Sequence, residues 1–415
     1  MEKYRILQVI GEGTYGKVFK AQERQTGRVV AIKKFKQSEE EDPHVKKTMM
    51  REIRILKEQR HINIVNLREY FREKGKLYLI FDYVQRTLLE ELQSSPDGLS
   101  TERIRLITYQ ILKANNYLHE SNIIHRDIKP ENLLISKAGI VKLCDFGFAR
   151  PMNSAANYQY TDYVSTRWYR APELLVGDAA YSGTVDVWAI GCIYAEIFNG
   201  MPLFPGDSDL HTLQLILETV TADDMEHDKP IQELSKKQRV AFRMNPLFES
   251  LKVPLAAEAI KSPETVKEVS FKALLKGITD TQLDFLRRCL VIDGGVRATL
   301  AELLEHPIFD EAFKSSFEAT MQEMERQDES EMQALMLKQL TTKDGRPELS
   351  PEELVTEDEK NDGEEDDEDD DEDEFEDDNS SSALDSAQGS SDASPGSSSG
   401  VGDNKQPWKK ETKKL

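Results

Sequence analysis

The chain has 415 residues, of which 38% are hydrophobic, and this length favours two domains or one bilobal domain followed by a tail. Its net charge of −22 is concentrated, because residues 357–378 hold eighteen acidic residues and one lysine, which leaves −5 for the other 393 positions. Cys144, Cys192 and Cys289 lie far apart without C-x-x-C spacing, which argues against a disulfide framework and a zinc site.

Membrane insertion and secretion are not expected either. No uninterrupted apolar run is long enough to cross a bilayer, and M-E-K-Y-R-I-L lacks the pattern of a secretory signal. We therefore expect a soluble protein without a membrane partner, with reduced thiols, in the cytoplasm or the nucleus.

Residues 4–83 predict a small lobe of antiparallel strands with one helix. The strand segments are short, rich in β-branched residues and partly alternating, and Gly-rich or Thr-Gly turns separate them. Lys74-Gly75 supplies the turn between the last two segments. The predicted strands are residues 4–10, 17–22, 28–35, 64–71 and 76–83.

Residues 43–60 change to a helical period, and Glu52 falls inside the apolar stripe of this helix. An unpaired buried carboxylate is unfavourable, so Glu52 needs a cation. Lys33, at the end of V-A-I-K, is the best candidate, although any single lysine is more often a surface residue. Lys34 is the neighbouring alternative, but strand alternation directs it to the opposite face. The stripe consists of Val45, Met49, Ile53 and Leu56.

Residues 88–309 predict a larger, helical lobe. Ser100 is a plausible N-cap for a helix that continues to His119. Residues 184–198 are apolar nearly all round and end at Asn199-Gly200, which is typical of a buried helix. The expected fold class is therefore α+β.

The C-terminal part of the chain differs in composition. Residues 310–340 could continue as a helical extension on the large lobe. Residues 341–415 combine the acidic block, a Ser/Gly/Asp-rich stretch and a lysine-rich end, and such sequence buries too little apolar surface to offset ordering entropy. We predict a disordered acidic tail.

A glycine-rich segment lies between the first two predicted strands. It fits G-x-G-x-x-G-x-V, which by itself is a weak signal because dinucleotide-binding proteins use the same glycines. Here a strand follows the loop instead of a helix, which favours a hairpin whose backbone amides approach phosphate oxygens. The segment is Gly11, Glu12, Gly13, Thr14, Tyr15, Gly16, Lys17 and Val18.

The strongest functional signal is His125-Arg126-Asp127, followed by Asn132 and then by Asp145-Phe146-Gly147. Phosphoryl transfer needs a carboxylate near the attacking hydroxyl and oxygen ligands for magnesium. We expect Asp127 to be the catalytic base, Asn132 and Asp145 to bind Mg²⁺, and Lys129 to neutralise the transferring phosphate. Each residue alone would more often be a loop cap or turn former. Together with Lys33 and Glu52 they predict an ATP-dependent protein kinase.

Ala171-Pro172-Glu173 closes a loop over residues 148–170, which contains Thr161-Asp162-Tyr163. Phosphates on Thr161 and Tyr163 would need cations, and several arginines could supply them. The plainer alternative is that both residues are merely exposed. The candidates are Arg51, Arg126 and Arg150 for Thr161, and Arg167 and Arg170 for Tyr163.

These motifs resemble the eukaryotic protein kinase family over about residues 4–309. T-R-W-Y-R-A-P-E and D-V-W-A-I-G-C are similar to the CMGC branch, which contains cyclin-dependent and mitogen-activated kinases. V-A-I-K-K-F-K, K-L-C-D-F-G-F-A-R and T-D-Y-V-S-T-R-W-Y-R most resemble the cyclin-dependent kinase-like family. The resemblance implies a bilobal kinase fold, ATP and Mg²⁺ as cofactors, serine or threonine in protein substrates, and an upstream activating kinase.

The resemblance also implies further residue roles. Phe81, Asp82, Val84 and Leu134 would surround the nucleotide, with Phe81 as gatekeeper and Asp82 and Val84 in the hinge. Asp186 would anchor the catalytic loop, and Arg297 would pair with Glu173. Thr14 and Tyr15 match positions of inhibitory phosphates in cyclin-dependent relatives, and Arg170 would favour proline-containing or otherwise branch-typical substrate sequences. Some family members act in or near cilia or flagella.

The sequence departs from the family at three places. The cyclin-binding P-S-T-A-I-R-E is replaced by K-K-T-M-M-R-E at 46–52, which puts cyclin dependence in doubt. D-P-x-x-R reads D-G-G-V-R at 293–297, and residues 207–275 are weakly typical. Two other hypotheses stay open beside the active kinase. One is a pseudokinase scaffold, and the other is a tail that binds basic proteins such as histones.

Overall fold

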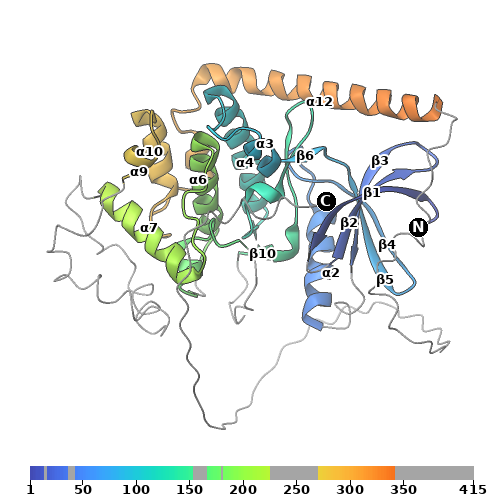
Figure 1. The fold of residues 1–415 in the computed structure, drawn as a ribbon, viewed down its shortest axis with the longest axis horizontal. Helices are drawn as coiled ribbons and strands as arrows, with labels where there is room; N and C mark the ends of the chain where they lie inside the picture. The colour runs from blue at the N-terminus through green and yellow to red at the C-terminus, as the bar shows by residue number, and fades with distance from the viewer. Residues whose placement is uncertain (14–15, 36–42, 153–165, 179–180, 225–269, 342–415) are drawn as a thin grey trace, which may run out of the picture. The chain divides into compact units, whose positions relative to one another are not determined.

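A computed structural model describes residues 1–13, 16–35, 43–152, 166–178, 181–224 and 270–341. Within these ranges the chain has the predicted α+β architecture, an antiparallel sheet with one helix followed by a helical lobe (Figure 1). The predicted disordered tail lies outside the described residues from position 342 onward, as do Thr14, Tyr15, Thr161 and Tyr163.

The small lobe is a five-stranded sheet in the order β1-β2-β3-β5-β4, and all neighbouring strands are antiparallel. Lys74 and Gly75, with φ of 50° and 71°, form the turn between β4 and β5, as predicted. The strands are β1 (Tyr4–Gly13), β2 (Gly16–Glu23), β3 (Val29–Phe35), β4 (Leu67–Glu73) and β5 (Lys76–Asp82).

The predicted start of the fourth strand at residue 64 is wrong. Ile64 instead forms an isolated parallel bridge with Leu143. The Val65 N–H donates to the Leu143 carbonyl at 2.9 Å, and the Leu143 N–H donates to the Asn63 carbonyl at 2.9 Å. This apolar stretch therefore joins the two lobes before β4 begins, a pairing that alternation alone does not reveal.

Helix α2 (Pro43–Glu58) belongs to the small lobe and ends two residues earlier than predicted. Met49, Ile53 and Leu56 are buried on its inner face, and Glu52 lies among them with 3% exposure. Helical spacing thus directs one carboxylate into the protein interior, as the sequence indicates.

The large lobe is built mainly from α4 (Thr101–Glu120) and α6 (Thr184–Asn199), which pack together. Ser100 caps α4, since its side chain accepts from the Arg103 N–H, and Gly200 ends α6 with φ of 77°. The other helices among the described residues of this lobe are α3 (Leu88–Gln93), α5 (Pro172–Leu175), α7 (Asp209–Asp224), α9 (Phe271–Leu274), α10 (Asp280–Cys289) and α11 (Leu300–Leu304).

Short strands and two 3-10 turns hold the loops that carry the site residues. β6, β8 and β9 form one small sheet, and β7 pairs with β10. Their bounds are β6 (Arg86–Thr87), β7 (Ile123–Ile124), η1 (Pro130–Asn132), β8 (Leu133–Ile135), β9 (Val141–Leu143), η2 (Phe146–Phe148) and β10 (Arg150–Pro151).

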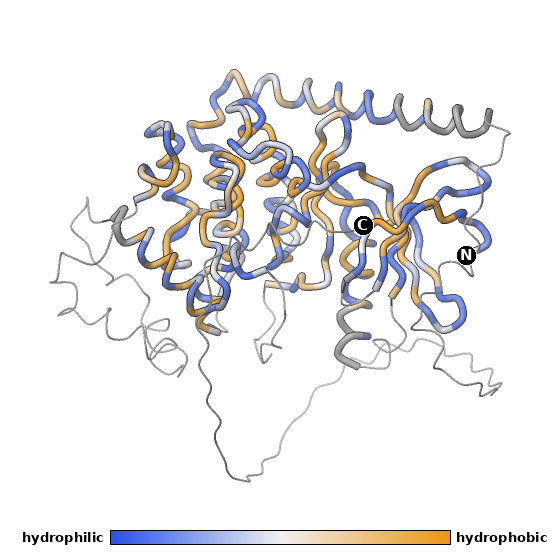
Figure 2. The backbone as a smooth tube through the Cα atoms, in the orientation of Figure 1, coloured by the Kyte–Doolittle hydropathy of each residue, from blue (hydrophilic) through white to orange (hydrophobic). Residues whose placement is uncertain are grey.

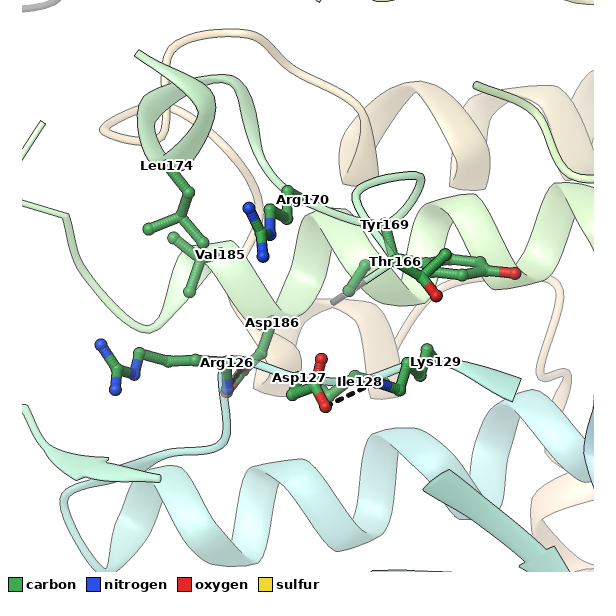
Figure 3. A pocket seen from close by; sticks show the side chains of 11 residues that line it. Arg126, Asp127, Ile128, Lys129, Thr166, Tyr169, Arg170, Leu174, Val185 and Asp186 are labelled. Carbon is green, nitrogen blue, oxygen red and sulfur yellow. Dashed lines mark hydrogen bonds and ion pairs between the residues drawn. The ribbon is translucent and has the colours of Figure 1, made fainter. Parts of the chain in front are cut away.

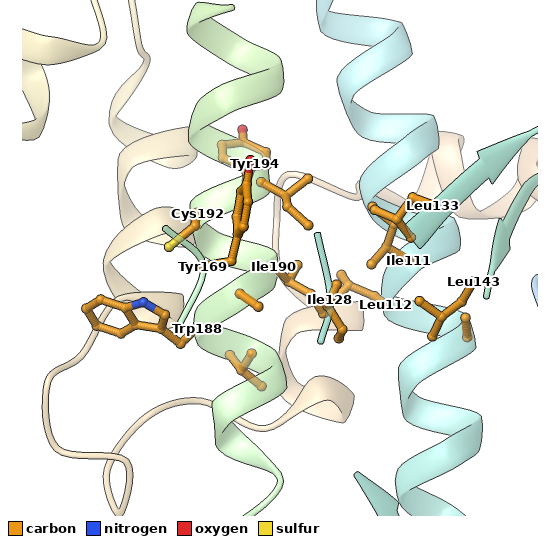
Figure 4. Close-up of a cluster of buried hydrophobic side chains, with 14 of the residues drawn as sticks. Ile111, Leu112, Ile128, Leu133, Leu143, Tyr169, Trp188, Ile190, Cys192 and Tyr194 are labelled. Carbon is orange, nitrogen blue, oxygen red and sulfur yellow. The ribbon is translucent and has the colours of Figure 1, made fainter. Parts of the chain in front are cut away.

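The main core surrounds α4 and α6. Figure 4 shows Ile190 of α6 on the side that faces Leu112 of α4 and also Ile128, whereas Trp188 projects from the opposite side of α6. Hydrophobic segments run through the strands and inner helices, while polar segments follow the loops (Figure 2). Cys144, Cys192 and Cys289 are free thiols that pack in or against this core. A well-packed α6 provides a rigid base for the loops above it.

Helix α12 (Glu311–Thr341) follows the large lobe. Phe313 and Phe317 pack edge-to-face against Tyr109 of α4, with ring centroids 5.3 and 4.6 Å away. Further along, the Asp328 carboxylate accepts from the Ala138 N–H at 3.2 Å. None of the described helices combines the length and apolar composition that a membrane crossing requires.

Candidate active site

Asp186 of α6 anchors the loop that carries Asp127. The Asp186 carboxylate is 1% exposed, and it accepts from the His125 N–H at 2.9 Å and the Arg126 N–H at 2.8 Å. Burial alone would raise the pKa of Asp186, but the hydrogen bond from His119 and the backbone donors hold that pKa below its usual value. Arg126 adopts φ of 69°, so the loop is held in a conformation that is unfavourable without such an anchor.

Asp127 lies within a short polar network. Its Oδ2 is 2.8 Å from Lys129 Nζ (Figure 3) and accepts from Asn132 Nδ2 at 2.8 Å. The same Nδ2 also donates to the Asp127 carbonyl at 2.8 Å. Burial would lower the pKa of Lys129, but the Asp127 carboxylate raises it overall. The loop therefore presents an oriented carboxylate beside a charged ammonium group.

A second network crosses from the small lobe to the large lobe. Lys33 Nζ lies 2.9 and 3.1 Å from the two Glu52 oxygens and 3.3 Å from Asp145 Oδ1. The predicted Lys33–Glu52 pair is confirmed. Burial would lower the pKa of Lys33, but Asp145 and Glu52 raise it, and Lys33 in turn lowers the pKa of Asp145. The three side chains are thus held as a charged cluster.

Asp145 adopts φ of 61°, the left-handed region that non-glycine residues seldom occupy. The next residue, Phe146, is fully buried and packs edge-to-face on His125, with centroids 5.0 Å apart. This packing fixes the turn and keeps the partly exposed Asp145 carboxylate near Lys33. The backbone strain is therefore offset by burial of the neighbouring ring.

The donor set fits Mg²⁺. The Asn132 Nδ2 is committed to Asp127, so Oδ1 is the atom that could bind a cation, and Asp145 offers carboxylate oxygens. Mg²⁺ is usually held by one or two protein carboxylates together with water and phosphates. The described residues contain no larger group of three His, Cys, Asp or Glu side chains suited to a metal. A two-residue magnesium site is chemically sufficient here.

The glycine hairpin fits a phosphate-binding role. Gly11 pairs with Val18, Glu12 with Lys17, and Gly13 with Gly16 at the tip of β1 and β2. A Cβ on Gly16 would lie 1.9 Å from the Lys34 carbonyl oxygen, so only glycine fits at this position.

The other residues predicted to surround the nucleotide lie at the end of β5, just after it, and in β8. Phe81 is 9% exposed and pairs with Ala31 in the sheet, and Asp82 ends β5 before Val84. Asp82 is held by Asn66 and Arg68 at 2.9 and 3.0 Å. Leu134 is partly buried in β8.

A pocket opens directly beside Asp127 and Lys129 (Figure 3). Its walls include Thr166, Tyr169, Leu174 and Val185, which were not among the predicted site residues. Thr166 and Tyr169 come from the T-R-W-Y-R segment, so their place between Asp-Phe-Gly and Ala-Pro-Glu was the available signal. The pocket adjoins the Asp127 carboxylate.

The predicted phosphate-binding arginines fall into two groups. Arg126 donates to the Phe148 carbonyl at 2.7 Å and to the Tyr181 hydroxyl at 2.6 Å. Arg150 extends from β10, and Arg51 is partly buried, with Nη1 lacking a hydrogen-bond partner among the described residues. The second group, Arg167 and Arg170, lies beside Asp209 of α7 at 2.8 and 3.6 Å.

Arg297 forms an ion pair with Glu173 of α5, as the family resemblance implies. The guanidinium donates to both Glu173 oxygens at 2.8 and 3.1 Å, and the two side chains are 0% and 4% exposed. Arg297 retains this contact even though its segment reads D-G-G-V-R. The pair therefore ties the end of the 148–170 loop to the large lobe.

Comparison with known proteins agrees with this geometry. Residues 4–309 match the protein kinase domain family. Cyclin-dependent kinase-like 4 of Mus musculus is 45% identical over 310 residues, covering 75% of this chain and 84% of the relative. Cyclin-dependent kinase-like 2 of Homo sapiens is 44% identical over 323 residues, covering 78% and 61%. Cyclin-dependent kinase-like 5 of Mus musculus is 43% identical over 309 residues, covering 74% and 31%. The chain belongs to the protein kinase family, in the cyclin-dependent kinase-like group of its CMGC branch.

Proposed function

We propose that this kinase transfers the γ-phosphate of ATP to serine or threonine hydroxyls of protein substrates, with Mg²⁺ as cofactor. The observation that carries the proposal is the pair of networks around Asp127 and Asp145. One network holds the Asp127 carboxylate beside the pocket lined by Thr166 and Tyr169, which we take as the substrate pocket, and the other joins the two lobes through Lys33. Phosphoryl transfer depends mainly on such positioning and charge stabilisation.

Each residue has a definite task in this reaction. Asp127 accepts the proton of the substrate hydroxyl, and Asn132 and Lys129 hold its carboxylate in one orientation. Lys129 also offsets negative charge on the phosphoryl group. Asn132 and Asp145 would hold Mg²⁺, which, when bound, would neutralise charge on the phosphates. Lys33, oriented by Glu52, binds the phosphate chain of ATP.

Regulation by phosphorylation of Thr161 and Tyr163, through an upstream kinase, is part of the proposal. The support is the gathering of basic side chains around the described ends of this loop. Arg126 donates to the Phe148 carbonyl near the start of the loop, and Arg167 and Arg170 lie at its C-terminal end beside Asp209. Phosphate on such a loop forms charge-assisted hydrogen bonds with arginine.

The decisive test compares the wild-type chain with Asp127→Asn in a radiometric assay on a generic basic protein. We expect the variant to lose at least about 100-fold in single-turnover rate, because the base is removed. Nucleotide binding by calorimetry should be retained, since Asp127 does not hold the nucleotide. Asp97→Asn, an exposed aspartate outside the site, is the matched control. Equal phosphate incorporation by the wild type and Asp127→Asn would remove the enzymatic assignment and leave a scaffold.

A further inference from the structure

The substrate pocket beside Asp127 has an excess of basic residues among its lining side chains. Arg126, Lys129 and Arg170 line it together with Asp127 and Asp186 (Figure 3). Asp186 is occupied by His119 and by the backbone donors of the catalytic loop. A pocket of this kind would attract acidic peptide residues unless another group offsets its charge.

Asp209 supplies such a group from outside the pocket. Its Oδ1 lies 2.8 Å from Arg167 Nε and 3.6 Å from Arg170 Nη1, so one carboxylate oxygen faces two guanidinium groups. Arg167 Nε and Asp209 Oδ1 are both buried atoms without an aligned hydrogen bond. The contact is therefore a coulombic ion pair, in which a better-aligned anion could replace the carboxylate.

One hydrogen bond holds the residues just before α7, whose first residue is Asp209, close to the segment that carries Arg167 and Arg170. The Trp168 indole donates to the Gly206 carbonyl at 3.0 Å, which joins the loop to the start of α7. The Arg170 N–H donates to the Arg167 carbonyl at 3.0 Å, so both arginines project from one tight turn. Asp209 thus keeps its position relative to the pocket wall.

We propose that Asp209 is a specificity-determining positioning residue of the substrate pocket. It orients Arg170 and offsets the charge of Arg167 and Arg170, and it thereby disfavours acidic residues next to the acceptor hydroxyl. This inference builds on the proposed kinase reaction and adds a preference for neutral or basic sequence around the acceptor. Rejection of the wrong ligand through a placed like charge is a common source of specificity.

The test uses the full chain and a peptide series with one acceptor serine. A single glutamate, in place of alanine, is moved through the three positions on each side of the serine. With Asp209→Asn, KM for the glutamate peptide at one or two positions should fall about three- to fivefold relative to the alanine peptide. A change in KM of this size is what loss of an ion pair between partly exposed side chains is expected to cause. The kcat for the alanine peptide should stay within about twofold, and Asp209→Glu should restore the wild-type preference.

Asp207→Asn is the matched control. Asp207 lies two residues earlier and is 84% exposed, and its ion pair is with His211 instead of the pocket arginines. It should leave the peptide preference unchanged. The shift in Asp209→Asn should also shrink when salt rises from about 0.05 M to about 0.5 M, because exposed charges are then screened.

A second readout separates this inference from the kinase reaction. Fluorescence anisotropy with labelled peptides, in which alanine replaces the acceptor serine, measures binding without phosphate transfer. An inactive wild type would overturn the proposed function, while the ratio of peptide affinities would still decide the role of Asp209. Equal changes for glutamate and alanine peptides at every position, or the same shift in Asp207→Asn, would overturn the inference.

Discussion

Replacement of Arg297 by methionine should strongly destabilise the large lobe. The Arg297 guanidinium is fully buried and donates to both oxygens of Glu173, which is itself only 4% exposed. It also donates to the carbonyls of Thr184 and Val291 at 2.7 and 2.9 Å. The substitution leaves a carboxylate buried without a cation, for which the expected loss is about 3–5 kcal/mol of unfolding free energy.

The assay is urea unfolding monitored by tryptophan fluorescence. The Arg297 guanidinium carbon lies 5.1 Å from the centre of the buried Trp188 ring, so this probe reports on the site itself. Arg288→Met is the control, because the Arg288–Asp284 pair is about half exposed and should contribute less than about 1 kcal/mol.

The double variant Glu173→Met/Arg297→Met completes a thermodynamic cycle. Removal of both charges leaves no orphaned carboxylate, so the double variant should be more stable than Arg297→Met alone, by about 1–3 kcal/mol. The role of an unpaired buried charge is refuted if Arg297→Met lowers the free energy of unfolding no more than Arg288→Met does. It is also refuted if the loss in the double variant equals the sum of the losses in the two single variants.

Two further changes test the networks around the site. Glu52→Gln should lower kcat/KM by about 10- to 100-fold, because Lys33 loses a charged hydrogen-bond partner. Steady-state kinetics measure this effect, and the control is Glu58→Gln, which changes an exposed glutamate on the same helix. Equal kcat/KM values for the two variants would contradict the role of Glu52. At Glu196, burial raises the pKa to about 7, so the folded state keeps a proton that the unfolded state releases. This contribution to stability is present below the unfolded pKa of about 4.5 and is lost as the pH rises towards 7. Relative to Glu196→Gln, the wild type should lose about 2–3 kcal/mol between about pH 5 and pH 8, and parallel stability profiles would show that Glu196 does not titrate in this range.

Several local features of both lobes could be predicted from neighbouring residues. The turn at Lys74-Gly75, the cap at Ser100 and the helical stripe that buries Glu52 all depend on neighbouring residues. The start of β4 could not be predicted in this way. Ile64 and Val65 have strand-like side chains, but the backbone hydrogen bonds of Asn63 and Val65 go to Leu143 of the other lobe. Composition does not say which partner an extended segment will find.

Some contacts of the candidate site could likewise be predicted from sequence spacing, and others could not. Asp127, Lys129 and Asn132 lie within six residues, so their spacing already limits how far apart they can be. Lys33 and Asp145 are 112 residues apart, and their contact depends on how the two lobes pack. The pocket residues Thr166 and Tyr169 and the arginine partner Asp209 emerge only from packing.

The amino-acid sequence by itself indicated the chemistry that we propose for this protein: a carboxylate base, an amide and a carboxylate for magnesium, and a lysine matched to a buried glutamate. Only the tertiary structure decided that Arg297 is enclosed with Glu173, and that Asp209 faces both Arg167 and Arg170. The physical reason is the separation of the interacting residues along the chain. Motif spacing constrains residues joined by a short stretch of backbone, whereas pairs of distant charges are selected by burial and by the docking of complete helices.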